Sequence, residues 1–112
     1  MRPLLVLILT LTSISMARAH AFLDHADPKV GSIVAAPTQV KIWMTMDLMK
    51  SSSTLQVFNA KGTEVDSKDV QVNAATMIVS LPKLPAGTYT VIWKAVAICT
   101  HKTSGTFTFT VK

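Results

Sequence analysis

The strongest structural signal in this sequence is a strict two-residue alternation near the C-terminus. Residues 105–111 alternate phenylalanine and valine with threonine, and residues 88–98 alternate Tyr89, Val91 and Trp93 with more polar side chains. Successive side chains of a β-strand point to opposite faces, so each segment has one apolar and one polar face. The pattern predicts two long antiparallel strands that form a hairpin, with the aromatic face turned inward.

Shorter segments of the same kind precede this hairpin. Residues such as proline, glycine, asparagine and aspartate separate them, and no segment shows the period of an amphipathic helix. We expect strands at residues 20–25, 40–46, 55–58 and 76–81, with one or two short edge strands within residues 64–72. Short strands at this spacing, without repeats or linkers, are typical of one all-β domain, a sandwich or a barrel.

Residues 1–19 predict a cleavable signal peptide. A basic residue near the start is followed by an apolar run at residues 4–16, and residues 17–19 (Ala-Arg-Ala) match the small-x-small cleavage pattern. The run is shorter than the roughly 20 residues that a membrane anchor needs. We therefore expect export, cleavage before His20, and a mature domain over residues 20–112 without stable membrane insertion.

Charge, cysteine content and motifs exclude several classes of protein. The formal net charge is +5, but two arginines leave with the signal peptide and the lysines are scattered singly. A nucleic-acid-binding groove needs basic residues clustered on one face, so we expect no nucleic-acid partner. Cys99 is the single cysteine, so no intrachain disulfide can reinforce the core. Motifs such as G-x-S-x-G and H-E-x-x-H are missing, and we expect no enzymatic activity.

Three residues are candidate metal ligands: His20, Cys99 and His101. A histidine at a processed N-terminus offers both its imidazole and the α-amine, which is less basic than a lysine amine and loses its proton more readily. Imidazole binds copper, nickel and zinc. Cys99 and His101 stand two residues apart in the expected hairpin loop, so their side chains can reach one ion.

Each candidate also has a purely structural interpretation. A loop histidine such as His101 is commonly just solvated, and Cys99 could turn inward, since a single cysteine is often a small buried hydrophobe. Met46 and Met49 carry thioethers, which suit soft ions such as Cu(I), although core packing is the simpler role for a methionine. His25, close to a proline, is expected to be an exposed turn residue.

Three blocks of the sequence carry a family resemblance. The blocks HAFLDHADPKVGSIVAAP at residues 20–37, LPKLPAGTYTVIWKAV at 81–96 and HKTSGTFTFTV at 101–111 resemble the CopC family of periplasmic copper-resistance proteins. The resemblance implies a seven-stranded, Greek-key, immunoglobulin-like β-sandwich or barrel. It also implies a Cu(II) site made by the N-terminal histidine, here His20, and by a D-x-H pair in the last hairpin, whose histidine is His101.

Cys99 occupies the position of the aspartate in that pair. A sulfur ligand favours Cu(I) over Cu(II), so the site should differ in character from that of the family. Some family members also carry a methionine-rich Cu(I) site, near which Met46 and Met49 fall, but the wider methionine motif is missing.

The resemblance therefore predicts a periplasmic protein that sequesters or transfers copper, as Cu(II) or Cu(I), in copper resistance or homeostasis. The implied partners are the copper ion and an inner-membrane copper transport protein. One alternative is a structural or interaction domain whose copper site has degenerated. Another is an oxidase that uses copper held by an N-terminal histidine, but so small a chain offers little surface for a substrate.

Overall fold

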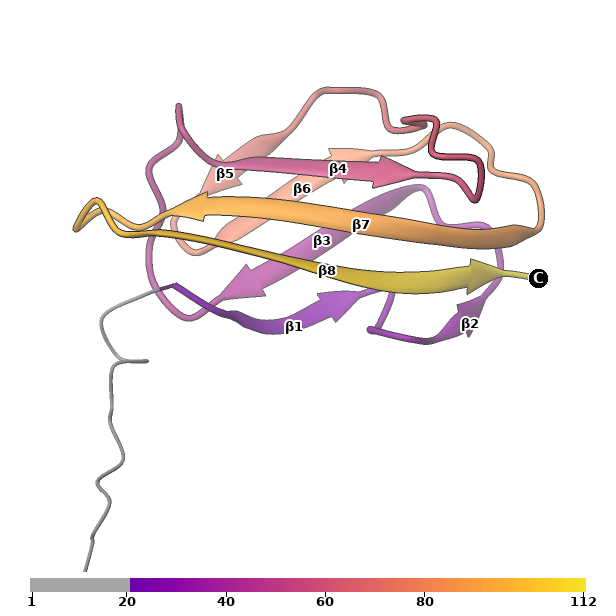
Figure 1. Ribbon diagram of the computed structural model, residues 1–112, viewed down its shortest axis with the longest axis horizontal. Helices are drawn as coiled ribbons and strands as arrows, with labels where there is room; N and C mark the ends of the chain where they lie inside the picture. Colours follow the sequence, from indigo (N-terminus) through magenta and orange to yellow (C-terminus); the bar gives the residue numbers. More distant parts are fainter. Residues whose placement is uncertain (1–20) are drawn as a thin grey trace, which may run out of the picture.

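The computed structural model describes residues 21–112, so His20 and the signal peptide expected over residues 1–19 lie outside the described residues. Eight strands form two four-stranded sheets that pack face to face (Figure 1). None of the described residues belongs to a helix long and apolar enough to cross a membrane. The all-β Greek-key sandwich predicted from the sequence is therefore confirmed.

The first sheet is antiparallel throughout and has the order β1-β3-β6-β5. Its strands are β1 (Leu23–Asp27), β3 (Gln39–Met44), β6 (Thr76–Ser80) and β5 (Gln71–Asn73). In the centre of this sheet, Val40 pairs with Val79 and Ile42 pairs with Met77. All four side chains are fully buried, so the apolar face of β3 and β6 forms one wall of the core.

The second sheet has the order β2-β8-β7-β4. Its strands are β2 (Ile33–Val34), β8 (Lys102–Val111), β7 (Gly87–Val96) and β4 (Thr54–Phe58). The two long strands β7 and β8 pair in an antiparallel hairpin over their full length, as the alternation predicted. Tyr89, Trp93 and Phe109 are 3%, 5% and 0% exposed, so the aromatic face does turn inward.

Two contacts of β7 explain particular residues of the sequence. Trp93 pairs with Gly105, and a Cβ atom at Gly105 would lie 2.5 Å from the Trp93 ring, so only glycine leaves room for the indole. At the other end of β7, the Tyr89 hydroxyl donates a hydrogen bond of 2.7 Å to the carbonyl of Pro85. This is the tyrosine corner of immunoglobulin-like sandwiches, and it fixes the entry into the strand.

Three expectations from the sequence need correction. The sandwich has eight strands rather than seven, because Ile33 and Val34 form the short β2 parallel to the end of β8. Two residues are too few to show a strand pattern, and their pairing depends on a partner far along the chain. The first strand covers residues 23–27, and His25 lies within it, exposed and stacked on Trp43 with 4.2 Å between ring centroids, rather than in a turn.

Candidate metal centre

The loop that joins β7 to β8, residues 97–101, lies at the left end of the sandwich in Figure 1. The Thr100 amide donates to the carbonyl of Ala97 at 2.7 Å, and the Ala97 amide donates to the carbonyl of His101 at 3.0 Å. Thr100 has a φ of 73°, in the left-handed region. A tight turn closed by a left-handed residue is a common three-residue hairpin connection, and it fixes the backbone on both sides of Cys99.

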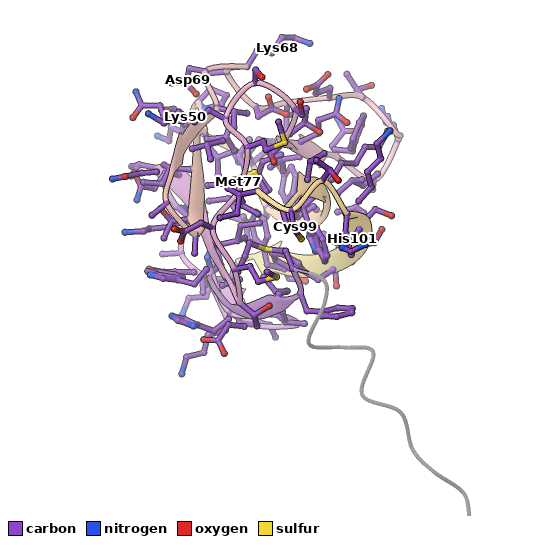
Figure 2. The ribbon with its side chains drawn as sticks, turned by 90° about the vertical axis from the view of Figure 1, so that its left-hand side faces the viewer. Lys50, Lys68, Asp69, Met77, Cys99 and His101 are labelled. Atoms are coloured by element: carbon purple, nitrogen blue, oxygen red, sulfur yellow. The ribbon has the colours of Figure 1, made fainter. Side chains whose placement is uncertain are left out.

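This turn brings the two donors of the loop together. The Cys99 sulfur lies 3.4 Å from Nδ1 of His101, and both residues are exposed (Figure 2). Metal–sulfur and metal–nitrogen bonds are about 2.3 and 2.0 Å long. If the sulfur–metal–nitrogen angle lies between those of square-planar and tetrahedral coordination, the sulfur and nitrogen atoms are roughly 3.0–3.6 Å apart. The observed separation therefore suits two ligands of a single ion. The interpretation of Cys99 as a buried hydrophobe is wrong.

The start of the described chain lies beside this loop. Ala21 is fully buried, and its carbonyl accepts a hydrogen bond of 2.6 Å from the hydroxyl of Thr103, two residues after His101. The Phe22 amide donates to the Thr45 hydroxyl, and the Thr45 amide donates to the Phe22 carbonyl, both at 2.8 Å. Thr45 follows β3 of the first sheet and Thr103 belongs to β8 of the second, so the chain start bridges the two sheets.

Sequence reasoning missed these two threonines as positioning residues. Thr103 stands two residues before Gly105, which faces inward opposite Trp93. Residues two apart in a strand lie on the same face, so the sequence did indicate that the Thr103 side chain turns toward the interior. Thr45 comes directly after the end of β3 at Met44 and gave no such signal. Both bond the chain start to the end of the sandwich.

The segment after β3 packs against the same loop. The Ile98 amide donates to the carbonyl of Asp47 at 3.1 Å, and the Met49 amide donates to the carbonyl of Val96 at 2.8 Å. Met46 is half-buried and packs against the core, and Met49 is half-buried at the edge of a groove. Within residues 21–112, no group of three or more histidine, cysteine, aspartate or glutamate side chains could hold a metal ion.

Of the three predicted ligands, the structure therefore brings Cys99 and His101 together, while His20 lies outside the described residues.

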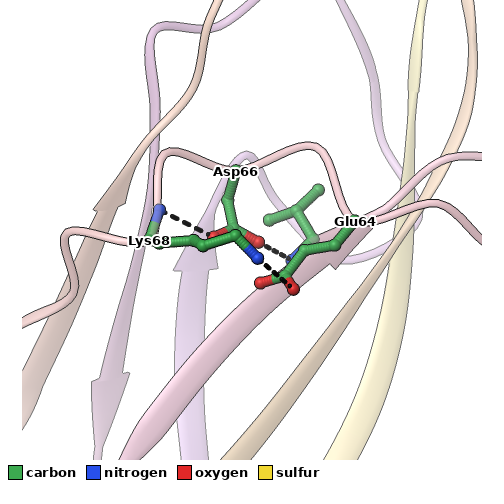
Figure 3. Close-up of polar contacts among 4 residues, drawn as sticks. Glu64, Asp66 and Lys68 are labelled. Atoms are coloured by element: carbon green, nitrogen blue, oxygen red, sulfur yellow. Dashed lines mark hydrogen bonds and ion pairs between the residues drawn. The ribbon is translucent and has the colours of Figure 1, made fainter.

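A second polar cluster lies at the edge strand β4 and serves the fold (Figure 3). Asp66 is only 7% exposed, and its two carboxylate oxygens accept hydrogen bonds from the amides of Val57 and Lys68, at 2.8 and 2.9 Å. Burial raises the pKa of Asp66. The Lys68 ammonium donates to Glu64 at 2.9 Å, and this hydrogen bond lowers the pKa of Glu64. These carboxylates are already engaged by the protein itself.

Comparisons with known proteins agree with this architecture. The CopC domain model matches residues 23–112. Copper resistance protein C of Escherichia coli is 35% identical over 106 residues, which cover 86% of this chain and 84% of that protein. Copper resistance protein C of Pseudomonas syringae pv. tomato is 31% identical over 107 residues, covering 88% of this chain and 85% of that protein.

Solved structures give the same result. The crystal structure of CopC from Methylosinus trichosporium OB3b superposes with a TM-score of 0.78 at 25% identity, covering 83% of this chain and 94% of that one. The crystal structure of PcoC, a methionine-rich copper resistance protein from Escherichia coli, gives a TM-score of 0.73 at 31% identity, covering 83% of this chain and 99% of that one. Sequence, fold and structural similarity thus agree over almost all the described residues, and the chain belongs to the CopC family.

Proposed function

We propose that the mature protein begins at His20, resides in the periplasm, and binds copper through His20, Cys99 and His101 in order to sequester the ion or pass it on. The relatives named as copper resistance proteins support copper as the ion. The observation that carries the proposal is the 3.4 Å separation between the Cys99 sulfur and Nδ1 of His101 in an exposed loop.

The position of Ala21 supports the participation of His20. Residue 20 is joined to Ala21 by one peptide bond, so their Cα atoms are about 3.8 Å apart. The Ala21 carbonyl is bonded to Thr103, close to His101 along β8. This contact of Ala21 supports His20 as a ligand whose α-amine becomes available once the signal peptide is removed. A preceding residue would convert that amine into an amide, which is a poor metal ligand.

The ligand set differs from the family pattern at position 99, where the softer sulfur of Cys99 replaces a carboxylate oxygen. Imidazole binds both Cu(II) and Cu(I), whereas a cysteine sulfur favours Cu(I) more than a carboxylate oxygen does. The site should therefore hold Cu(I) more tightly, relative to Cu(II), than a site with aspartate at position 99. We propose one copper site, because Met46 packs against the core and no wider methionine motif accompanies Met49. The relatives named as copper resistance proteins support a binding role rather than catalysis.

The test is a copper titration of protein that begins at His20, performed with Cu(II) and, under reducing conditions, with Cu(I). The matched control keeps one methionine before His20. We expect the additional residue to weaken Cu(II) binding by about 100-fold or more, since losing a ligand should cost at least as much as losing a supporting group. The circular dichroism spectrum should not change.

Equal Cu(II) affinity in the two forms would contradict the participation of His20. Failure of both forms to bind copper in either oxidation state would instead favour the structural or interaction role for the sandwich.

A further inference from the structure

A groove with a volume of about 560 Å³ lies beside the Cys99–His101 loop, at the end of β7 and the start of β8. Its lining combines two lysines, Lys94 and Lys102, with the apolar side chains of Met49 and Val96. Thr100, which separates Cys99 from His101, also borders it. The groove and the candidate metal centre therefore share a wall.

The two lysines have a defined spacing. Lys94 pairs with Ser104 and Val96 pairs with Lys102, so the lysines are diagonal neighbours on adjacent antiparallel strands. Diagonal neighbours lie roughly 7–8 Å apart. In an extended peptide, side chains two residues apart lie on the same face and are separated by about 6.6 Å. Two acidic residues at alternate positions of an extended segment would thus match the pair of lysines.

The groove carries uncompensated positive charge. None of its lining residues is acidic, and neither Lys94 nor Lys102 forms an ion pair with any residue in the described part of the chain. A neighbouring groove of about 380 Å³ also borders Lys94, but there Glu64 and Asp66 contribute negative charge. The charged side chains that line this groove are therefore both positive and can attract a negatively charged partner.

A third groove supplies an internal comparison. It has a volume of about 280 Å³, contains the single lysine Lys61, and is bordered by Pro85 and Tyr89 at the opposite end of the sandwich. It has neither the lysine pair nor a contact with the metal loop.

We propose that the groove containing Lys94 and Lys102 docks an extended acidic segment of a partner protein that exchanges copper with Cys99 and His101. The exchange rests on the proposed function, whereas the docking does not require copper. Ile98 is 63% exposed at the tip of the loop and offers an apolar contact beside the charged ones. A second copy of this chain fits poorly, because its net charge is also positive.

The probe is a short synthetic peptide that alternates glutamate with threonine, blocked at both ends, added to isotope-labelled protein and followed by NMR. We expect amide shifts at residues 49–52 and 94–104. Lys94→Glu combined with Lys102→Glu should weaken peptide binding at least about tenfold, because the reversed charges would face the like charges of the acidic peptide. The matched control, Lys61→Glu, should leave the affinity unchanged. Binding should weaken as salt is added.

Three results would overturn the docking proposal. These are equal shifts around Lys61 and Pro85, unchanged affinity in the double variant, or a free dicarboxylate such as glutarate binding as tightly as the peptide, which would reduce the groove to a simple anion site. Copper titration of the same double variant separates the two proposals. Loss of peptide binding with normal copper binding supports the docking groove, whereas peptide binding by a wild-type protein that binds no copper would refute only the copper function.

Discussion

Two loops of this sandwich hold polar side chains in opposite ways. Beside β4, the carboxylate of Asp66 is buried and accepts hydrogen bonds from two backbone amides, while Glu64 and Lys68 pair with each other. Between β7 and β8, Cys99 and His101 are both exposed and face each other across 3.4 Å. In the first loop the polar atoms complete the fold, and in the second they present a pair of donors at the surface.

The difference shows that residue type alone does not identify which side chains are accessible to a metal ion. A carboxylate such as Asp66 is a good ligand type, but its oxygens satisfy amides that would otherwise be buried without an acceptor. The Cys99 and His101 side chains, by contrast, are exposed and accessible to an ion. Substitutions in the two loops should therefore separate metal binding from stability.

The largest effect is expected for His101→Ala. This change removes an imidazole from the proposed site and should reduce copper affinity by about 100-fold or more. His101 is exposed, so the free energy of unfolding should change by less than about 0.5 kcal/mol. Competition titrations and urea unfolding of the same preparations measure the two quantities. If His101→Ala bound copper as tightly as the wild type, His101 would not be a ligand, and the β7–β8 loop would not differ from the Asp66 loop in metal binding.

Asp66→Ala should show the reverse behaviour. The amide of the fully buried Val57 would lose its acceptor, and an unsatisfied buried amide costs about 1–3 kcal/mol of stability. Copper affinity should stay within twofold of the wild type, since Asp66 lies outside the proposed site. Urea unfolding is the measurement, and a loss of copper binding in folded Asp66→Ala protein would show that the two loops are coupled.

Cys99→Asp tests the character of the donor pair. An oxygen ligand in place of sulfur should raise Cu(II) affinity and lower Cu(I) affinity, each by about tenfold, or about 1.4 kcal/mol. Because Cys99 is exposed, the substitution should not destabilise the fold. In the wild type, Cu(I) should also protect the thiol from alkylation. A thiol that reacts equally fast with and without Cu(I) would show that Cys99 is not a ligand.

The smallest effect concerns pH. The hydrogen bond from Lys68 lowers the pKa of Glu64 below 4.5, so the stability it contributes is complete above that pH and is lost as pH falls through the lowered pKa. Lys68→Gln should flatten this acid-side loss. Asp66 acts in the opposite direction, since burial raises its pKa above 3.8 and its contribution is lost as pH rises through the raised value. Urea midpoints of the wild type and of Lys68→Gln, measured between about pH 6 and pH 3, test this expectation. Identical pH profiles of the two proteins would show that the Glu64–Lys68 pair has no role in stability.

Most of the sandwich could be predicted because alternation is local. The hairpin of β7 and β8 shows its inward face in the sequence itself, and the burial of Trp93 followed directly. Features that depend on distant partners could not be predicted, among them the parallel pairing of β2 and the burial of Asp66. For the candidate site, the spacing of Cys99 and His101 predicted their proximity. Their exposure depends on how residues 97–101 turn, which alternation does not determine.

The hydrogen bonds of Ala21 and Phe22 to threonines of opposite sheets have a consequence for the lifetime of the protein. They fasten the chain start over one end of the sandwich through hydrogen bonds to both sheets. Proteases attack such ends in their transiently open form, at a rate set by how often that form is populated. An ion bound between the N-terminal residue and the last hairpin would hold the chain start in place and lower that population by mass action. If copper binds there as proposed, the copper-free protein should be cleaved faster than the copper-bound one.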